Sequence, residues 1–367
     1  MGTADGRRRG CSRTAAASSA CFPPDLIPEV ARRLTNLEDF FVLRASCREY
    51  RSLLPLIPSN LASQAPLLLL HHAATDSYAL FHLPLRRFLR FRLPRARLTD
   101  GRDRIIQFHS LGCRVAITDY ATELRVLHPF TGEETCLPIP PKMMLFTDFV
   151  LCYGNRMLTW RYCERIIQHC RLQDGDWRVA SISGPYCIED LIMVNGILYV
   201  LVTSGNSIST GYRLGVVELS DNDDSVELAF LGGQFDATTF HMDETSELYF
   251  CLAQCCGELI LLISAVELYP QTYHLFRWKS AEAKWARITS LGGFTLFFNT
   301  HYFVGCLGPD HPGIARDCIY FTDPEDEGCW SQYSSVDGCF RRSGPVDLEE
   351  QLMGFASSGY WVLPSMC

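Results

Sequence analysis

The sequence predicts a mainly β protein, a β-propeller of six or seven antiparallel blades that follows a short helical segment. Near the N-terminus apolar residues recur with a helical period, whereas after Leu61 they form short or alternating runs typical of strands. No stretch between these runs is long enough for a crossover helix, so the sheets should be antiparallel. Roughly 300 residues of short strands are too many for a single β-sandwich. Blades of about 40–50 residues arranged in a ring can hold them and leave few exposed strand edges. A large double-sheet β domain is the alternative.

The composition argues against several classes of function. With 367 residues, 47% hydrophobic and 20% charged, the chain has an ordinary globular composition. The net charge of -8 argues against nucleic-acid binding, and the basic run 86–104 is interpreted as a solvated turn. The longest apolar run, 259–266, is far shorter than the roughly 20 residues that span a bilayer. With no signal peptide evident, we expect a cytoplasmic and/or nuclear protein without a membrane partner.

The chain contains 17 cysteines but no Cys-x-x-Cys pair. The densest group is Cys251, Cys255 and Cys256, which lacks the usual spacing of metal ligands. We therefore expect no metal and predict reduced thiols that are mostly buried as small hydrophobic side chains.

The N-terminal residues 1–20 are predicted to be a disordered tail, because they are rich in small and basic residues without periodicity. A first helix should follow Asp25 as its N-cap, with Pro28 in the opening turn. Its apolar stripe combines Leu26, Val30 and Leu34 at helical spacing.

A second helix is predicted from Thr35 to Leu54. Thr35 and Glu38 have capping-box spacing. Pro55 and Pro58 should end the helix and mark a short linker. A unit of about 35 residues is too small for a core of its own, so its apolar residues need the following domain or a second protein as a partner surface.

This helical segment resembles the F-box of plant proteins. The residues that occupy the positions of the F-box pattern are Pro23, Pro24, Asp25, Leu26, Arg33, Leu34, Asp39, Phe40, Leu43, Arg44, Cys47, Tyr50 and Arg51. Three positions depart from the pattern, since Phe22 stands for Leu, Ser46 for Val and Tyr50 for Trp. A hydroxyl such as that of Ser46 in an apolar contact costs free energy unless it is hydrogen-bonded.

The remainder of the chain resembles the β-propeller that follows the F-box in the plant KIB-type F-box proteins. Short strands and hairpin turns such as Asn195-Gly196 fill this region, and Cys256-Gly257 and Asp174-Gly175 are further turn candidates. The stretches that carry the resemblance are 110–112, 127–132 with 137–138, 190–199, 257–261, 276–277, 284–285, 290–292, 317–323 and 361–364. His128 and Cys113 depart from the family pattern of Asn and Trp, respectively. We assign these landmarks, including Trp285, a structural role.

The sequence contains no motif for a known catalytic or phosphate-binding site. His71-His72 are placed at a strand end, and His301, Asp310 and His311 are interpreted as a solvated loop. The acidic segments 221–224 and 323–327 should connect strands. We expect no catalytic residues and no cofactor.

The resemblance implies a substrate-recognition subunit of an SCF-type cullin ubiquitin ligase. Residues 21–58 would form the F-box, which docks on a Skp-type adaptor, and residues 59–367 the propeller, which binds an unknown target protein for ubiquitination. The adaptor contact would use Pro23, Pro24, Leu26, Ile27, Val30, Leu34, Phe40, Leu43 and Tyr50. Two other classes remain open: a scaffold that no longer engages a cullin, and a propeller enzyme or sugar-binding protein, which the missing motifs disfavour.

Overall fold

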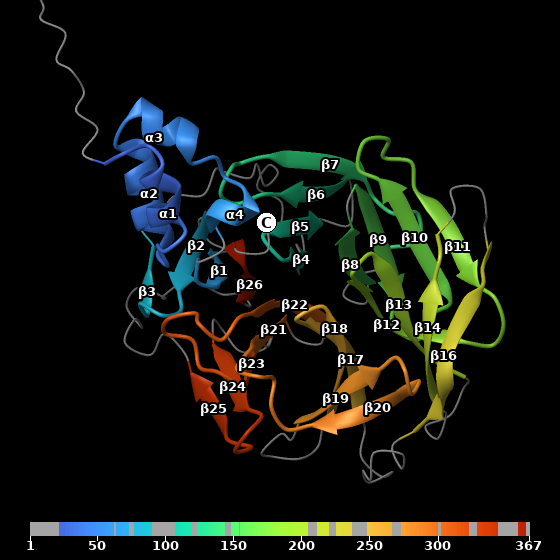
Figure 1. Ribbon diagram of the computed structural model, residues 1–367. Coiled ribbons are helices and arrows are strands. Elements are labelled where there is room, and N and C mark those ends of the chain that lie inside the picture. Colours follow the sequence, from blue (N-terminus) through green and yellow to red (C-terminus); the bar gives the residue numbers. More distant parts are fainter. Residues whose placement is uncertain are drawn as a thin grey trace, which may run out of the picture.

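The protein is a six-bladed β-propeller with a helical segment at one rim of the ring, as the computed structural model shows (Figure 1). The structure describes residues 22–61, 64–72, 77–89, 107–118, 123–143, 148–153, 155–204, 211–219, 225–236, 248–265, 273–299, 302–322, 329–343 and 359–364. The predicted fold class is confirmed, with six as the blade number. The predicted N-terminal tail lies outside the described residues.

Each blade is one twisted sheet. Blade 1 contains β4 (Gln107–Leu111), β5 (Arg114–Thr118), β6 (Glu123–Leu127) and β7 (Glu134–Pro138). Blade 2 contains β8 (Asp148–Tyr153), β9 (Arg156–Arg161), β10 (Ile166–Arg171), β11 (Arg178–Ile182) and, at its edge, β15 (Ser225–Val226). Blade 3 contains β12 (Cys187–Val194), β13 (Ile197–Thr203), β14 (Tyr212–Val217) and β16 (Leu228–Phe235).

The second half of the ring continues this order. Blade 4 contains β17 (Leu248–Cys255), β18 (Glu258–Ala265), β19 (Tyr273–Lys279) and β20 (Lys284–Ile288). Blade 5 contains β21 (Thr295–Asn299), β22 (Tyr302–Leu307), β23 (Cys318–Thr322), β24 (Trp330–Ser334) and β25 (Phe340–Ser343). Blade 6 joins β26 (Tyr360–Val362) to β1 (Leu67–His72), β2 (Ser77–His82) and β3 (Arg87–Phe88).

Two strand pairs depart from the predicted antiparallel arrangement. β11 pairs with β15 in parallel, because the connection from β14 to β16 crosses to the edge of blade 2. β21 pairs with β23 in parallel, because β22 takes the innermost position of blade 5 and residues 308–317 then return the chain to the side of β21. The sequence pattern did not predict these two parallel pairs. The expectation of antiparallel sheets assumed that parallel strands need a crossover helix, whereas here a loop brings each strand to its parallel partner.

Blade 6 closes the ring, because it combines strands from both ends of the described chain. The C-terminal strand β26 pairs with β1, where Trp361 lies opposite Leu68. Asn299 Oδ1 accepts hydrogen bonds from the Trp361 N–H at 2.9 Å and from Thr322 Oγ1 at 2.9 Å. The Ser110 hydroxyl donates to the Trp361 carbonyl. These bonds connect blades 1, 5 and 6 at the point of closure.

The predicted turns are confirmed. Asn195 and Gly196 have φ angles of 50° and 83°, and Cys256 and Gly257 have φ angles of 53° and 75°, as a two-residue hairpin with the right twist requires. The Asn195 side chain donates to the Gly257 carbonyl at 2.8 Å and joins the two turns. The third predicted turn, at Asp174-Gly175, connects β10 to β11.

His128 takes the structural role that an asparagine would have in the turn after β6. Its Nδ1 accepts hydrogen bonds from the backbone N–H groups of Phe130 and Thr131, both at 3.3 Å. Its own carbonyl accepts from the Gly132 N–H. A side-chain acceptor, rather than the imidazole itself, is therefore what this position needs.

We predict that His128→Ala destabilises the protein by about 1–2 kcal/mol, because two turn N–H groups lose their acceptor. His128→Asn should cost clearly less, since the Asn oxygen can accept the same bonds. Urea unfolding of the two variants and the wild type measures this difference. Equal destabilisation by Ala and Asn would contradict the assigned role.

The helical segment contains α1 (Leu26–Ala31), α2 (Leu37–Ala45), α3 (Arg48–Leu53) and the single turn α4 (Pro58–Leu61). Asp25 does not cap α1, because it is itself helical and carbonyls of Pro23 and Pro24 already accept the first N–H groups. The cap of α2 is Asn36, which accepts from the Glu38 N–H at 3.1 Å, so the predicted Thr35 capping box is wrong.

The second predicted helix is in fact two helices. The chain is extended at Cys47, with φ -154° and ψ 169°, and the Cys47 sulfur accepts from the Tyr50 N–H as the cap of α3. Pro58 opens α4, where its missing N–H breaks no helical bond. No helix among the described residues is long and apolar enough to cross a bilayer.

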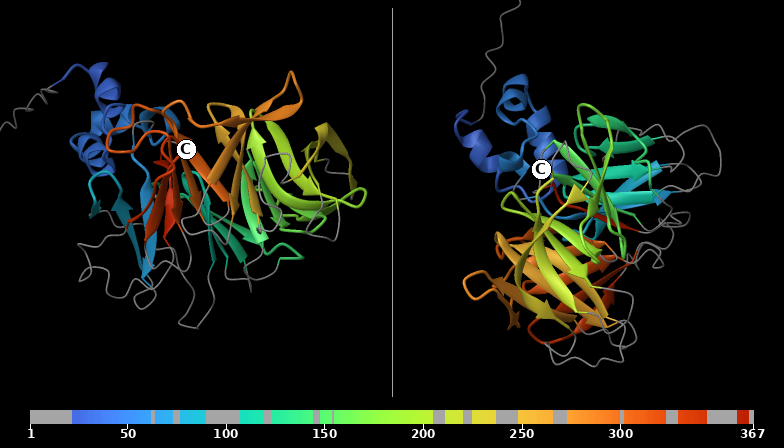
Figure 2. Two further views of the ribbon diagram at one scale, coloured as in Figure 1. Left: turned by 90° about the horizontal axis from the view of Figure 1, so that it is seen from below. Right: turned by 90° about the vertical axis from the view of Figure 1, so that its right-hand side faces the viewer.

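Helices and propeller share one hydrophobic core, so the helical segment is packed on the rim of the ring and not suspended from it (Figures 1 and 2). The helical segment contributes seven fully or almost fully buried side chains, and blades 6 and 1 provide the opposing surface. The residues of the helical segment are Ile27, Ala31, Leu37, Phe40, Tyr50, Leu54 and Leu61, and the strand residues are Leu67, Leu69, Leu80, Phe108, Val115, Ile117, Leu127 and Val362.

Candidate functional site

The helical segment presents apolar side chains to solvent on the side away from this shared core. Leu26 and Val30 on α1 are 49% and 39% exposed, and Phe22, which precedes the helix, is 53% exposed. Leu26 and Val30 are four residues apart, so both lie on the same side of α1. Pro23 and Pro24 are also exposed. We call Phe22, Pro23, Pro24, Leu26 and Val30 the α1 surface.

The remaining predicted adaptor contacts belong to the interior. Ile27 and Phe40 have no exposed area and Tyr50 retains 6%. Leu34 and Leu43 are partly buried and pack against the same core. The predicted adaptor contacts thus form two groups. One group is exposed and accessible to a partner, and the other packs the helices against the propeller.

Polar contacts reinforce this attachment. Arg87 of β3 forms an ion pair with Glu38 of α2 at 2.6 Å, and Glu38 raises the pKa of the Arg87 guanidinium through this hydrogen bond. Gln64 donates to the Leu34 carbonyl at 2.5 Å. The helical segment is therefore held at a fixed position on the ring.

His82 connects the two parts at a buried position. Its Nδ1 accepts from the Leu85 N–H at 3.1 Å, so its Nε2 carries the proton and donates to the Thr35 carbonyl at 3.1 Å. Burial lowers the pKa of His82, which favours this neutral form.

The structure explains one departure from the F-box pattern. Ser46 is exposed and donates to the Val42 carbonyl at 2.9 Å, so its hydroxyl is hydrogen-bonded within its own helix. Tyr50, which stands where the pattern has Trp, fills the shared core. Neither residue interrupts the α1 surface.

A cavity of about 290 Å³ lies between the inner strands of blades 1 to 5. Polar side chains along it include Ser110, Cys152, Asp190, Gln254 and Tyr302, and apolar side chains fill the spaces between them. The Tyr302 hydroxyl accepts from the Ser110 N–H at 3.1 Å, which joins blades 1 and 5 across this cavity.

Asp190 joins blades 3 and 4 beside the cavity. One carboxylate oxygen accepts from the Leu191 N–H and the other from the Leu252 N–H, both at 2.7 Å. β12 and β17 belong to different sheets, so this side chain supplies a direct link between them. Burial raises the pKa of Asp190 to about 7 and that of the adjacent Glu189 also to about 7.

These pKa values predict a pH-dependent stability. The folded-state pKa of Asp190 is about 7 and lies above the ordinary value of 3.8, so the folded protein binds more protons than the unfolded chain between these values. The free energy of unfolding should therefore fall as pH rises through this window. Asp190→Asn should make the fall shallower, with Glu189 causing the remainder, and urea unfolding at several pH values tests this. An unchanged slope in the variant would contradict the assignment.

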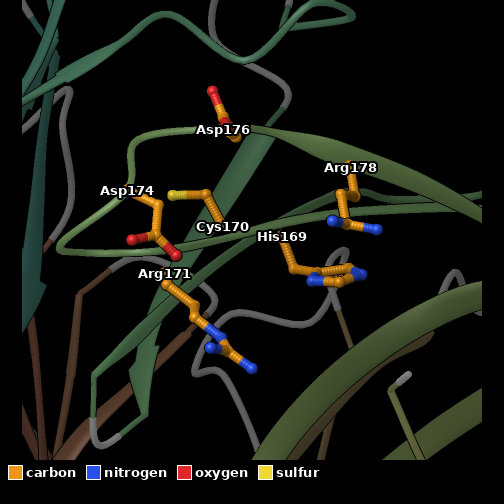
Figure 3. Close-up of a pocket in the computed structure, with 6 residues that line it drawn as sticks. All are labelled: His169, Cys170, Arg171, Asp174, Asp176 and Arg178. Atoms are coloured by element: carbon orange, nitrogen blue, oxygen red, sulfur yellow. The ribbon is translucent and has the colours of Figure 1, made fainter. Parts of the chain in front are cut away.

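A second, smaller pocket of about 110 Å³ lies on blade 2 (Figure 3). His169, Cys170 and Arg171 come from β10, Arg178 from β11, and Asp174 and Asp176 from the turn between them. The pocket combines two arginines with two aspartates, and Arg156 contacts the His169 ring at 3.4 Å. Charges of both signs therefore line this pocket.

Other predicted polar positions do not form a site among the described residues. No group of three or more His, Cys, Asp or Glu side chains in that part of the chain could hold a metal ion. Asp310 forms an exposed ion pair with Arg316 at 3.7 Å. His301 and the acidic segments 221–224 and 323–327 lie outside the described residues, as do most of the basic run and the side chains of His71 and His72.

Comparison with known families identifies the propeller. Residues 80–340, more than two thirds of the chain, match the KIB1-4 β-propeller family. The chain belongs to this family. The predicted KIB-type propeller is thus confirmed, and family and fold together support a protein-binding propeller. The family match begins at β2, so it does not include the helices or the strand β1.

The KIB1-4 propeller has weak structural similarity to other propellers, and no curated protein matches its sequence. A quinonprotein alcohol dehydrogenase-like protein from Bacteroides thetaiotaomicron has 10% identity and a TM-score of 0.39, with 78% of this chain and 63% of that chain covered. YCF48 bound to D1 peptide has 9% identity and a TM-score of 0.36, with 77% and 78% covered. The Cps50 (Swd1) β-propeller domain of Myceliophteria thermophila has 13% identity and a TM-score of 0.32, with 78% and 77% covered. These similarities are too low to bear on function.

Proposed function

We propose that this protein is the substrate-recognition subunit of an SCF-type cullin ubiquitin ligase. Its helical segment is an F-box like those of the plant KIB-type proteins and docks on a Skp-type adaptor. Its propeller holds a target protein for ubiquitination in the cytoplasm and/or nucleus. The chemistry belongs to other subunits, so the chain itself needs no catalytic residues.

The observation that carries this proposal is the exposure of Leu26 and Val30 on α1. Both occupy the F-box-like segment, and both remain accessible although the opposite side of the same helix is buried at Ile27 and Ala31. Large apolar side chains gathered on one helix surface are typical of a protein-binding site. The resemblance of the segment to an F-box supports a Skp-type adaptor as the partner of this surface.

The shared core gives the proposal a mechanical basis. A ligase receptor works by holding the target near the conjugating enzyme, which raises the effective concentration of target lysines. Because the helices pack on blades 6 and 1, the adaptor and the propeller surface keep a fixed relative position. A flexible attachment would spread the target over a larger volume and lower that concentration.

The shared core limits which variants can test adaptor binding. Deleting the helical segment is unsuitable, because it would uncover apolar side chains such as Leu67 and Leu80 in the propeller core. Substitution of exposed residues is the sharper test. We expect tagged full-length protein to recover Skp and cullin from cells, and the double variant Leu26→Asp, Val30→Asp to lose both. Failure of the folded wild type to recover a cullin would favour a scaffold role.

A further inference from the structure

Three cysteines meet where blades 4 and 5 adjoin. Cys255 is the last residue of β17, Cys256 follows it in the turn, and Cys306 lies on β22. The sulfur of Cys306 is 3.8 Å from that of Cys255, although 51 residues separate them in sequence. Free thiols this close are within the range from which a disulfide can form after small side-chain rotations.

The two thiols have different surroundings. Cys255 is 2% exposed, and its thiol is directed at the Leu291 carbonyl at 4.0 Å, whereas Cys306 is half-buried and Cys256 is exposed. The thiol of Cys306 donates to the Cys255 sulfur, and this bond lowers the pKa of Cys255 against the opposing effect of burial. The same bond raises the pKa of Cys306. Cys255 is therefore the thiol of the pair that ionises first.

The strands around the pair allow a new bond. β17 and β22 are the inner strands of separate sheets. Hydrogen bonds within one sheet therefore do not fix the distance between Cys255 and Cys306. To form a disulfide, the sulfur atoms must approach from 3.8 Å to a bond length of about 2.05 Å. Gln254 beside Cys255 and Val304 near Cys306 line the central cavity. A bond here would therefore fix two strands of the cavity wall.

We propose that Cys255 and Cys306 form a peroxide-oxidisable dithiol site whose disulfide joins blades 4 and 5. The Cys255 thiolate attacks one oxygen of hydrogen peroxide, so an S–O bond forms, the O–O bond breaks, and the departing hydroxide takes a proton to become water. The Cys306 sulfur then attacks the sulfenic sulfur, the S–O bond breaks, and the hydroxide leaves with the Cys306 proton as water. Two thiols and one peroxide thus give one disulfide and two waters.

This site is independent of the proposed ligase function. Protein disulfides in reducing compartments are usually transient and redox-sensing, which suits a pair that a thiol reductant can restore. Oxidation closes a loop between positions 255 and 306, so the oxidised protein should be more resistant to unfolding.

The test treats reduced, folded full-length protein with hydrogen peroxide and analyses the disulfides by non-reducing peptide mass spectrometry. A Cys256→Ser background removes the neighbouring thiol, so that a cross-linked peptide reports on Cys255 alone. The expected result is an intramolecular Cys255–Cys306 link, a higher thermal midpoint, and reversal of both by dithiothreitol. Cys306→Ser should abolish the link and the shift of the midpoint, and Cys339→Ser, at an exposed cysteine, should change neither.

Two results would overturn the proposal. One is that both thiols of the folded, peroxide-treated protein remain open to alkylation after unfolding. The other is that the recovered disulfide joins a different pair or two separate chains. Because the wild-type result stands without any variant, a folding defect in Cys306→Ser would not obscure either outcome.

Discussion

Replacing Trp361 with alanine should remove a large share of the free energy of unfolding. Trp361 has no exposed area, and its ring contacts those of Phe297, Tyr320 and Trp330 with centroid separations of 5.3, 6.1 and 6.3 Å. Loss of a buried aromatic ring of this kind costs about 3–5 kcal/mol. Since domains are typically stable by about 5–15 kcal/mol, this is a large share of the total. Denaturant unfolding followed by fluorescence and circular dichroism measures the loss.

Two control variants distinguish a loss of propeller closure from the effect of an arbitrary substitution. Trp361→Phe should retain much of the stability, because the indole N–H has no hydrogen-bond partner among the described residues and the aromatic packing persists in part. Val336→Ala, at a side chain that is 67% exposed, should stay within about 0.5 kcal/mol of the wild type. If Trp361→Ala were no more destabilising than Val336→Ala, β26 would not be the element that closes the ring.

The second large effect concerns the α1 surface. Leu26→Asp with Val30→Asp should weaken adaptor binding by more than about 100-fold, because each charge would enter an apolar contact where hot-spot truncation alone costs about 2 kcal/mol. Stability should change little, since both side chains are already exposed. Affinity for a purified Skp-type adaptor, measured by calorimetry, gives the size of the loss.

Leu85→Asp provides a matched control for this variant. Leu85 is 46% exposed, similar to Leu26, but it lies in the turn between β2 and β3 of the propeller. We expect unchanged adaptor affinity for Leu85→Asp. Equal weakening by the two variants would indicate a nonspecific effect of charge, and unchanged affinity in the Leu26, Val30 variant would exclude the α1 surface as the docking site.

Strand patterns and turn residues predicted most of the propeller. Asn195-Gly196 and Cys256-Gly257 determine hairpins locally, so their positions could be derived from neighbouring residues alone. The parallel partners of β11 and β21 could not, because a loop that leaves its own blade has no periodic signature. The sequence predicts six or seven blades and no single number, because its aromatic and glycine landmarks define no clean period.

The helical segment shows where local patterns fail. An unbroken helical stripe from Phe40 to Leu54 predicted one helix, but the cap formed by the Cys47 sulfur divides it, and cysteine is not among the residues expected at a cap. The sequence also does not show which side of α1 faces the propeller and which faces solvent. Ile27 and Leu26 are equally apolar, and the surface that buries Ile27 comes from strands of blades 6 and 1.

The α1 surface is the proposed docking site for the adaptor of a cullin ligase. The decisive experiment is a calorimetric titration of the intact, folded chain with purified Skp-type adaptor. We expect saturable one-to-one binding, and we expect the Leu26→Asp, Val30→Asp variant to lose it while its unfolding curve stays that of the wild type. Absence of any binding by the folded wild-type chain would exclude this docking site.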